Sequence, residues 1–237
     1  MELYSRCIEE INALLPEKHT AMWAYSPERA FPDGDKNAII FRSDVAFELG
    51  GSGLSSVSSV VFENGENIND SIILYGDDLK DIKKDTSFAH FTFVGMKTEK
   101  DGEYRYEELK NTEFSVYKIH PDGYNIRISP TESREQVRVG KNAVEKGISF
   151  ENIGANLIRE FKKNPCVESV KTVFVTLDDF DYKAAFVLAK KAAKITSAID
   201  TSLSLGSVDC KSCSMKAICN EVEGLRELHF RKAENKK

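Results

Sequence analysis

Three of the five cysteines in this chain lie within ten positions of one another, at Cys210, Cys213 and Cys219. Thiolates are soft anionic metal ligands, and a C-x2-C turn lets two of them reach one metal from a tight loop. The third can complete the same site from the start of a following helix. His229 extends the spacing to C-x2-C-x5-C-x9-H. This pattern predicts a site for zinc or an iron–sulfur cluster, and the alternative is a set of unpaired thiols in a reducing compartment.

The fourth ligand of such a site has two candidates. Cys166 offers a thiolate, the better ligand for a cubane, and the Asn-Pro pair before it predicts a turn that exposes the side chain. His229 offers an imidazole, which binds iron or zinc. A helix over Glu221–Phe230 would hold His229 roughly 13–15 Å from Cys219 unless it broke at Gly224. We prefer His229, and the competing interpretation is a helix-terminal histidine favoured by the helix dipole.

Composition and charge narrow the functional class. The net charge of −5 argues against a protein held to nucleic-acid phosphates, because such contacts need surplus Lys and Arg. No apolar run approaches the roughly 20 residues that span a bilayer, so no membrane association is expected. The N-terminal residues show no secretory signal, and an odd number of cysteines fits a cytoplasmic protein with reduced thiols.

The elements that must position the cysteines follow from hydrophobic periodicity. One apolar stripe predicts a helix over residues 2–14, on which Cys7 is a core thiol and not a ligand. Residues 16–37 hold three of the six prolines and predict an irregular connection. From residue 38 the apolar residues recur with a period of two, which is typical of strands. The segments predicted as strands are Ala38–Phe41, Asp44–Leu49, Ser55–Phe62, Ser71–Tyr75, Ser87–Met96 and Tyr124–Ser129.

The second half of the chain alternates between helical and strand patterns. A long β-branched strand is predicted at Val167–Leu177. Asp178 and Asp179 stand where a helix start favours acceptors, so we interpret them as caps and not as an acid–base pair. The predicted helices are Glu103–Lys118, Ser133–Lys146, Phe150–Lys163 and Asp178–Ile199. The fold class is therefore α+β, a mixed sheet with helices packed on it.

This pattern divides the chain into three parts. We expect an N-terminal helix and connection over residues 1–37, an α+β domain over 38–205 and a cysteine-rich segment over 206–237. The Gly-rich stretch 50–53 follows a strand, but no helix opens after it, so it predicts a turn and not a phosphate loop. His90 lies within a strand pattern and is interpreted as a satisfied sheet residue. The sequence assigns no catalytic residue.

The order of these elements, ending in the cysteines, resembles the acetyl-CoA synthase subunit of the carbon monoxide dehydrogenase/acetyl-CoA synthase complex. The resemblance is to the middle region of that subunit and covers roughly residues 38–230. It rests on Phe47-Glu48-Leu49-Gly50-Gly51, on Ile73-Leu74-Tyr75-Gly76-Asp77-Asp78, on Tyr124-Asn125-Ile126-Arg127-Ile128-Ser129, on a Gly-containing helix near Gly154 and on the strand Val170–Thr176. It implies the fold of the middle domain of acetyl-CoA synthase.

The resemblance also implies a ligand set. That family builds its nickel–iron–sulfur site on four cysteines spaced C-x2-C-x8-C-x9-C. Cys210, Cys213 and Cys219 match the first three with a shorter loop, and His229 occupies the fourth position at matching spacing. The position of Cys213 is the one that bridges to nickel in the family. A downstream Cys-Gly-Cys that binds the second nickel is not found in this sequence, so the expected nickel site is incomplete.

Three functions stay open at this point. The first is an acetyl-CoA synthase-like protein of one-carbon metabolism with a [4Fe–4S] cluster, which works with a redox partner or with another protein of a carbon monoxide dehydrogenase-type complex. The second is a binding or accessory protein whose C-terminal tail is stapled by a Cys3His zinc knot. The third is a metal-free relative with no catalysis.

Overall fold

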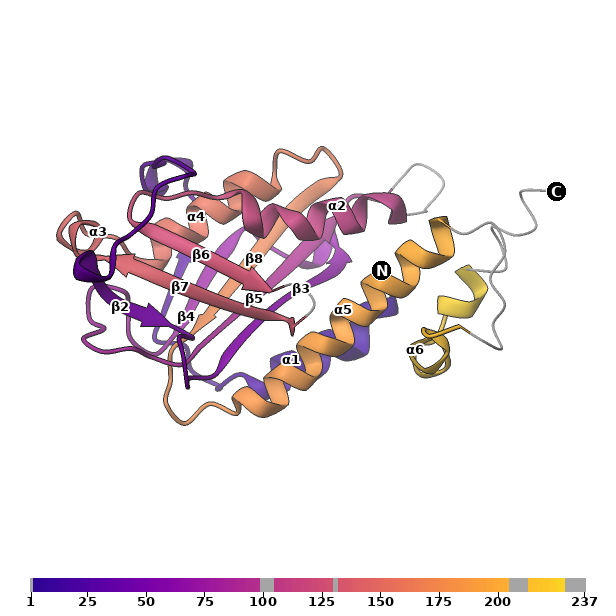
Figure 1. Cartoon of the computed structure of the whole chain (residues 1–237). Coiled ribbons are helices and arrows are strands. Elements are labelled where there is room, and N and C mark those ends of the chain that lie inside the picture. The colour runs from indigo at the N-terminus through magenta and orange to yellow at the C-terminus, as the bar shows by residue number, and fades with distance from the viewer. Residues whose placement is uncertain (1, 99–104, 130–131, 205–212, 229–237) are drawn as a thin grey trace.

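The computed structural model describes residues 2–98, 105–129, 132–204 and 213–228 (Figure 1). Two sheets face each other, and helices cover their edges and outer sides. Across these residues, no helix combines the length and the apolar character that crossing a bilayer needs.

The main sheet has five strands in the order β1-β4-β8-β5-β3. β3 runs parallel to β5 and β4 runs parallel to β8, whereas β5 and β8 are antiparallel to each other, as are β1 and β4. The sheet is therefore mixed, as the fold class predicted. All nine residues of β5 are buried, because β5 has sheet neighbours on both sides and packed layers on both faces. The strands are β1 (Ala21–Ala24), β3 (Ser56–Asn64), β4 (Ser71–Tyr75), β5 (Phe88–Met96) and β8 (Val167–Val175).

The small sheet has three antiparallel strands in the order β2-β7-β6 and lies in front of the main sheet in Figure 1. The strands are β2 (Val45–Leu49), β6 (Tyr124–Ser129) and β7 (Arg134–Gly140). Glu135, Val137 and Val139 are buried while the residues between them are only half-buried. This alternation is typical of a sheet with one face toward a core, so these three side chains point at the main sheet.

Helix α4 (Phe150–Phe161) packs on β4 and β8. It begins at Ser149, whose hydroxyl accepts the amide proton of Asn152. A Cβ at Gly154 would lie 2.6 Å from the Ile72 side chain, so this glycine permits the close approach of helix and sheet. The shorter helical elements are α2 (Leu109–Glu113), α3 (Lys141–Glu145) and the 3-10 turns Glu2–Tyr4, Pro27–Arg29, Arg42–Asp44, Gly65–Asn67, Tyr106–Glu108 and Phe114–Lys118.

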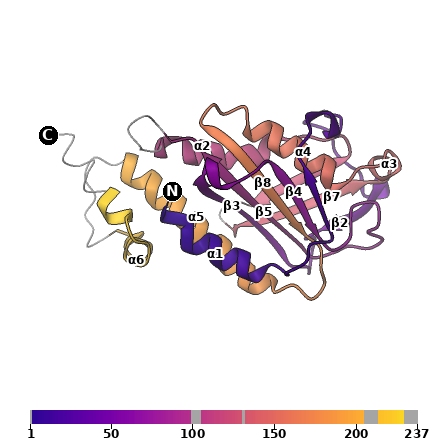
Figure 2. The same ribbon diagram turned by 180° about the vertical axis from the view of Figure 1, so that it is seen from behind.

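Helices α1 (Ser5–Leu14) and α5 (Tyr182–Ser204) lie side by side, and α5 runs along β3 at the edge of the main sheet (Figures 1 and 2). The Tyr4 hydroxyl lies 3.0 Å from Thr196 Oγ1 on α5. Cys7 is 1% exposed, and burial raises the pKa of its thiol to about 11. The prediction of a core thiol is confirmed. Helix α6 (Lys216–Glu221) packs on the outer side of α5.

Four local predictions differ from the structure. Residues 38–41 form no strand in the described part of the chain, because Ile39 and Phe41 stay 72% and 69% exposed and gain nothing from pairing. Arg134–Gly140 is a strand and not part of a helix, because its apolar residues alternate with period two. The connection over 16–37 contains β1, which pairs with β4. Asp181 caps α5 through the Ala184 amide, in place of the two aspartates before it.

Candidate functional site

The cysteine segment is described from Cys213 onward, and Cys210 and His229 lie outside the described residues. Cys213 stands in the turn before α6 and Cys219 on α6 itself, and both are partly exposed. The Met215 amide donates to Cys213 Sγ at 3.4 Å, and the Lys216 amide donates to the Cys213 carbonyl. The turn thus presents one sulfur with a backbone donor already aimed at it.

An N–H donor to sulfur stabilises a metal-bound thiolate and tunes the potential of an iron–sulfur cluster. The donor set here is soft, partly exposed and carried by a turn and a helix start, so it fits zinc or an iron–sulfur cluster better than a hard cation. Within the described ranges, no group of three or more His, Cys, Asp or Glu side chains gathers as a metal site. Two of the four predicted ligands fall outside those ranges, so the ligand set stays a prediction.

Lys191 on α5 fastens α6 to the rest of the molecule. Its Nζ lies 3.3 Å from Glu10 Oε2 on α1 and 2.9 Å from Glu221 Oε1 on α6, and its side chain is only 13% exposed. Burial by itself lowers the pKa of Lys191, but the hydrogen bonds and charges of Glu221 and Glu10 raise it above its ordinary value. Ile218 on α6 and Leu225 after it are buried. One lysine therefore joins three helices.

The segment after α6 changes direction at Gly224. The helix ends at Glu221, and Gly224 adopts a φ of +87°, which favours glycine. A new helical turn begins there, with the Leu228 amide donating to the Gly224 carbonyl. The continuous helix predicted over Glu221–Phe230 is therefore wrong. The break occurs at the residue where the His229 hypothesis required it.

Cys166, the competing fourth ligand, lies directly before the first residue of β8. It is 9% exposed, and Arg105 Nη1 donates to its Sγ at 3.8 Å. Its carbonyl accepts the Lys97 amide. The predicted turn before β8 is present, but the Cys166 side chain is buried in the packing at the end of the main sheet, so the predicted exposure of the thiol is wrong.

A buried polar network joins the two sheets, and the sequence did not indicate its centre. Glu135 Oε2 on β7 accepts from Ser58 Oγ at 3.0 Å and lies 2.9 Å from His90 Nδ1 on β5. His90 Nε2 lies 2.9 Å from Thr172 Oγ1 and 3.1 Å from Thr92 Oγ1. Both ring nitrogens of His90 are engaged and the side chain is 1% exposed. The interpretation of His90 as a satisfied sheet residue is confirmed, whereas Glu135 was missed because its segment was assigned to a helix.

The Gly-Gly turn after β2 positions Glu135. Ser56 Oγ donates to the Glu135 carbonyl at 2.5 Å and accepts its amide at 2.9 Å. Gly50 has a φ of +60°, and a Cβ there would lie 2.7 Å from the Ser56 Cβ and 2.9 Å from the Glu135 carbonyl oxygen. The prediction of a turn is confirmed. Its glycine is needed because three strands meet at this point.

A cavity of about 140 Å³ lies under the inner face of β6. Its lining includes Tyr117, Ile119, Tyr124, Ile126 and Ile128, together with polar residues such as Lys36 and Asn125. This surface was not predicted, because it is assembled from residues 34–40 and 117–128, which are far apart in the sequence.

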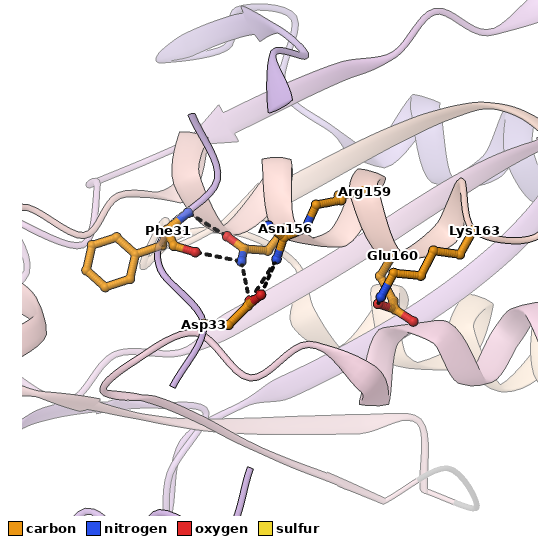
Figure 3. Close-up of polar contacts among 6 residues, drawn as sticks. All are labelled: Phe31, Asp33, Asn156, Arg159, Glu160 and Lys163. Atoms are coloured by element: carbon orange, nitrogen blue, oxygen red, sulfur yellow. Dashed lines mark hydrogen bonds and ion pairs between the residues drawn. The ribbon is translucent and has the colours of Figure 1, made fainter. Parts of the chain in front are cut away.

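The wall of the cavity is held by hydrogen bonds. The Gly34 amide donates to the His120 carbonyl at 2.7 Å, and Asp33 forms a β-bridge with Pro121. Figure 3 shows how α4 anchors this wall: the buried Asn156 side chain bonds to the amide and the carbonyl of Phe31, and Arg159 Nη2 lies 2.7 Å from both carboxylate oxygens of Asp33. The cavity is therefore formed by ordered backbone.

Comparison with known proteins gave one family. A family model described as "CO dehydrogenase/acetyl-CoA synthase complex beta subunit" matches residues 34–179, which is more than half of the chain. The match includes both sheets except β1, and it ends before α5 and the cysteine segment. No curated protein matched the chain.

Proposed function

The chain belongs to the family of the CO dehydrogenase/acetyl-CoA synthase complex beta subunit, and from this premise we propose that its acetyl-CoA synthase-like body carries an iron–sulfur cluster on the C-terminal cysteines. The matched residues end at 179. The cluster proposal therefore depends on the chemistry of the cysteine segment itself.

The observation that supports it best is the turn at Cys213. Its sulfur accepts the Met215 amide at 3.4 Å, and Cys219 follows on a helix that Lys191 fastens to α5. A cluster ligand needs an accessible sulfur, a nearby backbone donor and a fixed support. Within the described residues this segment offers all three.

We assign Cys210, Cys213 and Cys219 as the thiolate ligands and His229 as the fourth. The break at Gly224 supports His229, because a straight helix would have carried it away from Cys219. The burial of Cys166 and its bond to Arg105 argue against that residue. When bound, a [4Fe–4S] cluster would supply one-electron transfer, and a histidine ligand would raise its potential.

The partner that this function requires is a protein that exchanges electrons with the cluster, either another member of a carbon monoxide dehydrogenase-type complex or a separate redox protein. The family assignment supports a partner within such a complex. A reducing cytoplasm would keep the five cysteines as thiols before the cluster is inserted.

The test is anaerobic purification and reconstitution with iron and sulfide, followed by the absorption spectrum and by iron, sulfide and zinc per chain. We expect a broad band near ~400 nm that is lost in Cys213→Ser and Cys219→Ser. His229→Ala should lower the iron content, while Cys166→Ser should retain it. Circular dichroism of each apo-variant checks that it folds.

Two results would refute the proposal. A colourless protein with stoichiometric zinc would identify the zinc knot of the second hypothesis. Iron retained when both Cys213 and Cys219 are replaced would show that the metal binds elsewhere. If His229→Ala keeps its iron and Cys166→Ser loses it, only the assignment of the fourth ligand is wrong.

A further inference from the structure

One edge of the small sheet has no part in the proposed function. β6 is the outermost strand of that sheet and lies along its upper side in Figure 1. It pairs with β7 on one side, and on the other side the described residues place no strand beside it. An unpaired strand edge presents a row of N–H and C=O groups with which a second extended chain can pair. The free edge of β6 is therefore a candidate binding surface.

The hydrogen-bond pattern of β6 defines which groups face that edge. The Gly140 amide donates to the Gly123 carbonyl at 2.8 Å, so this pair is a hydrogen-bonded position of the β6–β7 ladder. Such positions alternate along an antiparallel pair, and the bonds to β7 therefore come from residues 125, 127 and 129. Ile126 and Ile128 lie between them and direct their N–H and C=O groups away from β7. No other described segment hydrogen-bonds to these groups.

The segment that runs beside β6 covers only the beginning of its edge. The Asn125 side chain donates to the Ala38 carbonyl at 3.2 Å, and beyond this bond no described residue of the segment is hydrogen-bonded to β6. Ile39 and Phe41 follow directly, and their side chains are 72% and 69% exposed. The two β6 residues with free backbone groups also line the cavity, so open space adjoins them. An added strand would thus meet free backbone groups near exposed apolar side chains.

The charges along this edge favour an acidic partner. Arg127 lies between the two free positions, is exposed and forms no ion pair with a described residue. Lys36, in the lining of the cavity, is also exposed and without an ion pair in the described part of the chain. Asp122 is paired with Lys146 at 2.8 Å, which leaves Asp35 as the lining carboxylate without a basic partner among the described residues. Positive charge therefore exceeds negative charge, and carboxylates on an added strand would be attracted.

The geometry of strand pairing fixes the sequence pattern of such a partner. Its residues opposite Ile126 and Ile128 would bond to them and point their side chains to the inner face of the sheet. The residue between these two would lie opposite Arg127 on the outer face. A second copy of β6 does not fit this pattern. The register that pairs Ile126 of one copy with Ile128 of the other puts the two Arg127 side chains opposite each other, and like charges repel.

We propose that the free edge of β6 binds an extended acidic segment of a partner protein by strand addition. A carboxylate of the partner lies opposite Arg127, and apolar residues lie opposite Ile126 and Ile128. The main-chain bonds supply affinity, and the alternating side chains supply specificity. The surface is separate from the proposed cluster, since it includes no residue of α5 or α6. The apo-protein can therefore test it without regard to the metal.

The experiment uses the full chain, labelled with nitrogen-15, and the acetylated and amidated peptide Glu-Val-Glu-Val-Glu as the probe. One matched peptide carries lysine in place of glutamate. Another carries N-methylvaline in place of valine and cannot donate the main-chain bonds. We expect the acidic peptide to cause saturable shifts of the Ile126 and Ile128 amide resonances. The lysine peptide should bind about fivefold more weakly, and the N-methylated peptide should not bind.

Arg127→Glu reverses the charge at the centre of the edge. The variant should prefer the lysine peptide to the acidic peptide, also about fivefold. Because Arg127 is exposed, the fold should be kept, which circular dichroism checks. Lys18→Glu, at an exposed lysine in the connection before β1, makes the same charge change as a matched control and should retain the wild-type preference. Added salt should weaken binding of the acidic peptide to the wild type.

Three results would overturn the inference. The first is that no peptide shifts the amides of Ile126 and Ile128, as expected for an edge that only water covers. The second is that Arg127→Glu keeps the wild-type preference, or that the N-methylated peptide binds as tightly as the unmodified one. The third is that these amides are protected from exchange in the free protein and that the protein sediments as a dimer, which would assign the edge to a second copy of the chain.

Discussion

Replacing Lys191 with Met should release the cysteine-bearing helix without unfolding the protein. Methionine keeps most of the aliphatic stem of Lys191, but it removes the charge that lies 3.3 Å from Glu10 and 2.9 Å from Glu221. The two carboxylates are 35% and 51% exposed, so they return to water once the lysine is gone. The variant therefore leaves no buried unpaired charge.

The size of the effect follows from this exposure. Ion pairs with one exposed partner contribute about 0.2–1 kcal/mol each after solvent screening. The lysine itself is 13% exposed, which places both pairs near the upper end of that range. Only the Glu221 pair holds α6, so the loss is about 1 kcal/mol of docking free energy, or a ~5-fold increase in the population of the undocked state.

Hydrogen exchange of the apo-protein measures that population directly, because an undocked helix exchanges its amides through local opening. We expect faster exchange over residues 216–228 in Lys191→Met and no change in the main sheet. Lys183→Met, at an exposed lysine in the first turn of α5, is the matched control. Equal exchange in the two variants would show that Lys191 does not hold α6.

Three further predictions concern the scaffold and the pH dependence. Gly50→Ala should lower the melting temperature more than Gly53→Ala, because both have a positive φ but an added Cβ clashes only at Gly50; equal shifts would contradict this. Glu135→Ala should cost about 1–3 kcal/mol in denaturant unfolding, since it removes the hydrogen-bond partner of the buried His90 Nδ1 and of Ser58 Oγ. The exposed Glu132→Ala should stay within ~0.5 kcal/mol. The hydrogen bond and charge of Lys191 lower the pKa of Glu221, so the contribution of this ion pair to the docking of α6 is fully present above the ordinary value of 4.5 and is lost as the pH falls through the lowered pKa. Exchange over α6 that does not change with acid would refute this contribution.

The sequence predicted elements best where local signals agreed. Ser71–Tyr75 and Tyr124–Ser129 have the predicted bounds, because each is a short β-branched or alternating run between turn residues. Arg134–Gly140 was missed because its outward positions hold Arg and Gln, good helix formers, and only pairing with β2 and β6 reveals its period.

The candidate sites also differ in whether a local signal in the sequence indicates them. The cysteine spacing is a local signal, so the sequence could indicate a metal site, and the positions of Cys210 and His229 stay predictions. The network around Glu135 and the cavity beside Tyr124 are assembled by strand register and by bridges such as Asp33–Pro121. Such contacts join residues far apart in sequence, and no periodicity within one segment encodes them.

The strand order of the main sheet has a consequence for synthesis of the chain. β8 lies between β4 and β5, yet it is made after every other strand that the described residues form. Until residues 167–175 leave the ribosome, the β1–β4 pair and the β3–β5 pair cannot join, and the apolar edges of β4 and β5 stay open to wrong partners. Helix α1 can dock only later still, because the Tyr4 hydroxyl before it bonds to Thr196, which is 192 positions later in the chain. The main sheet can therefore form only after β8 has emerged, and ribosome-bound chains that end before β8 should be favoured clients of chaperones.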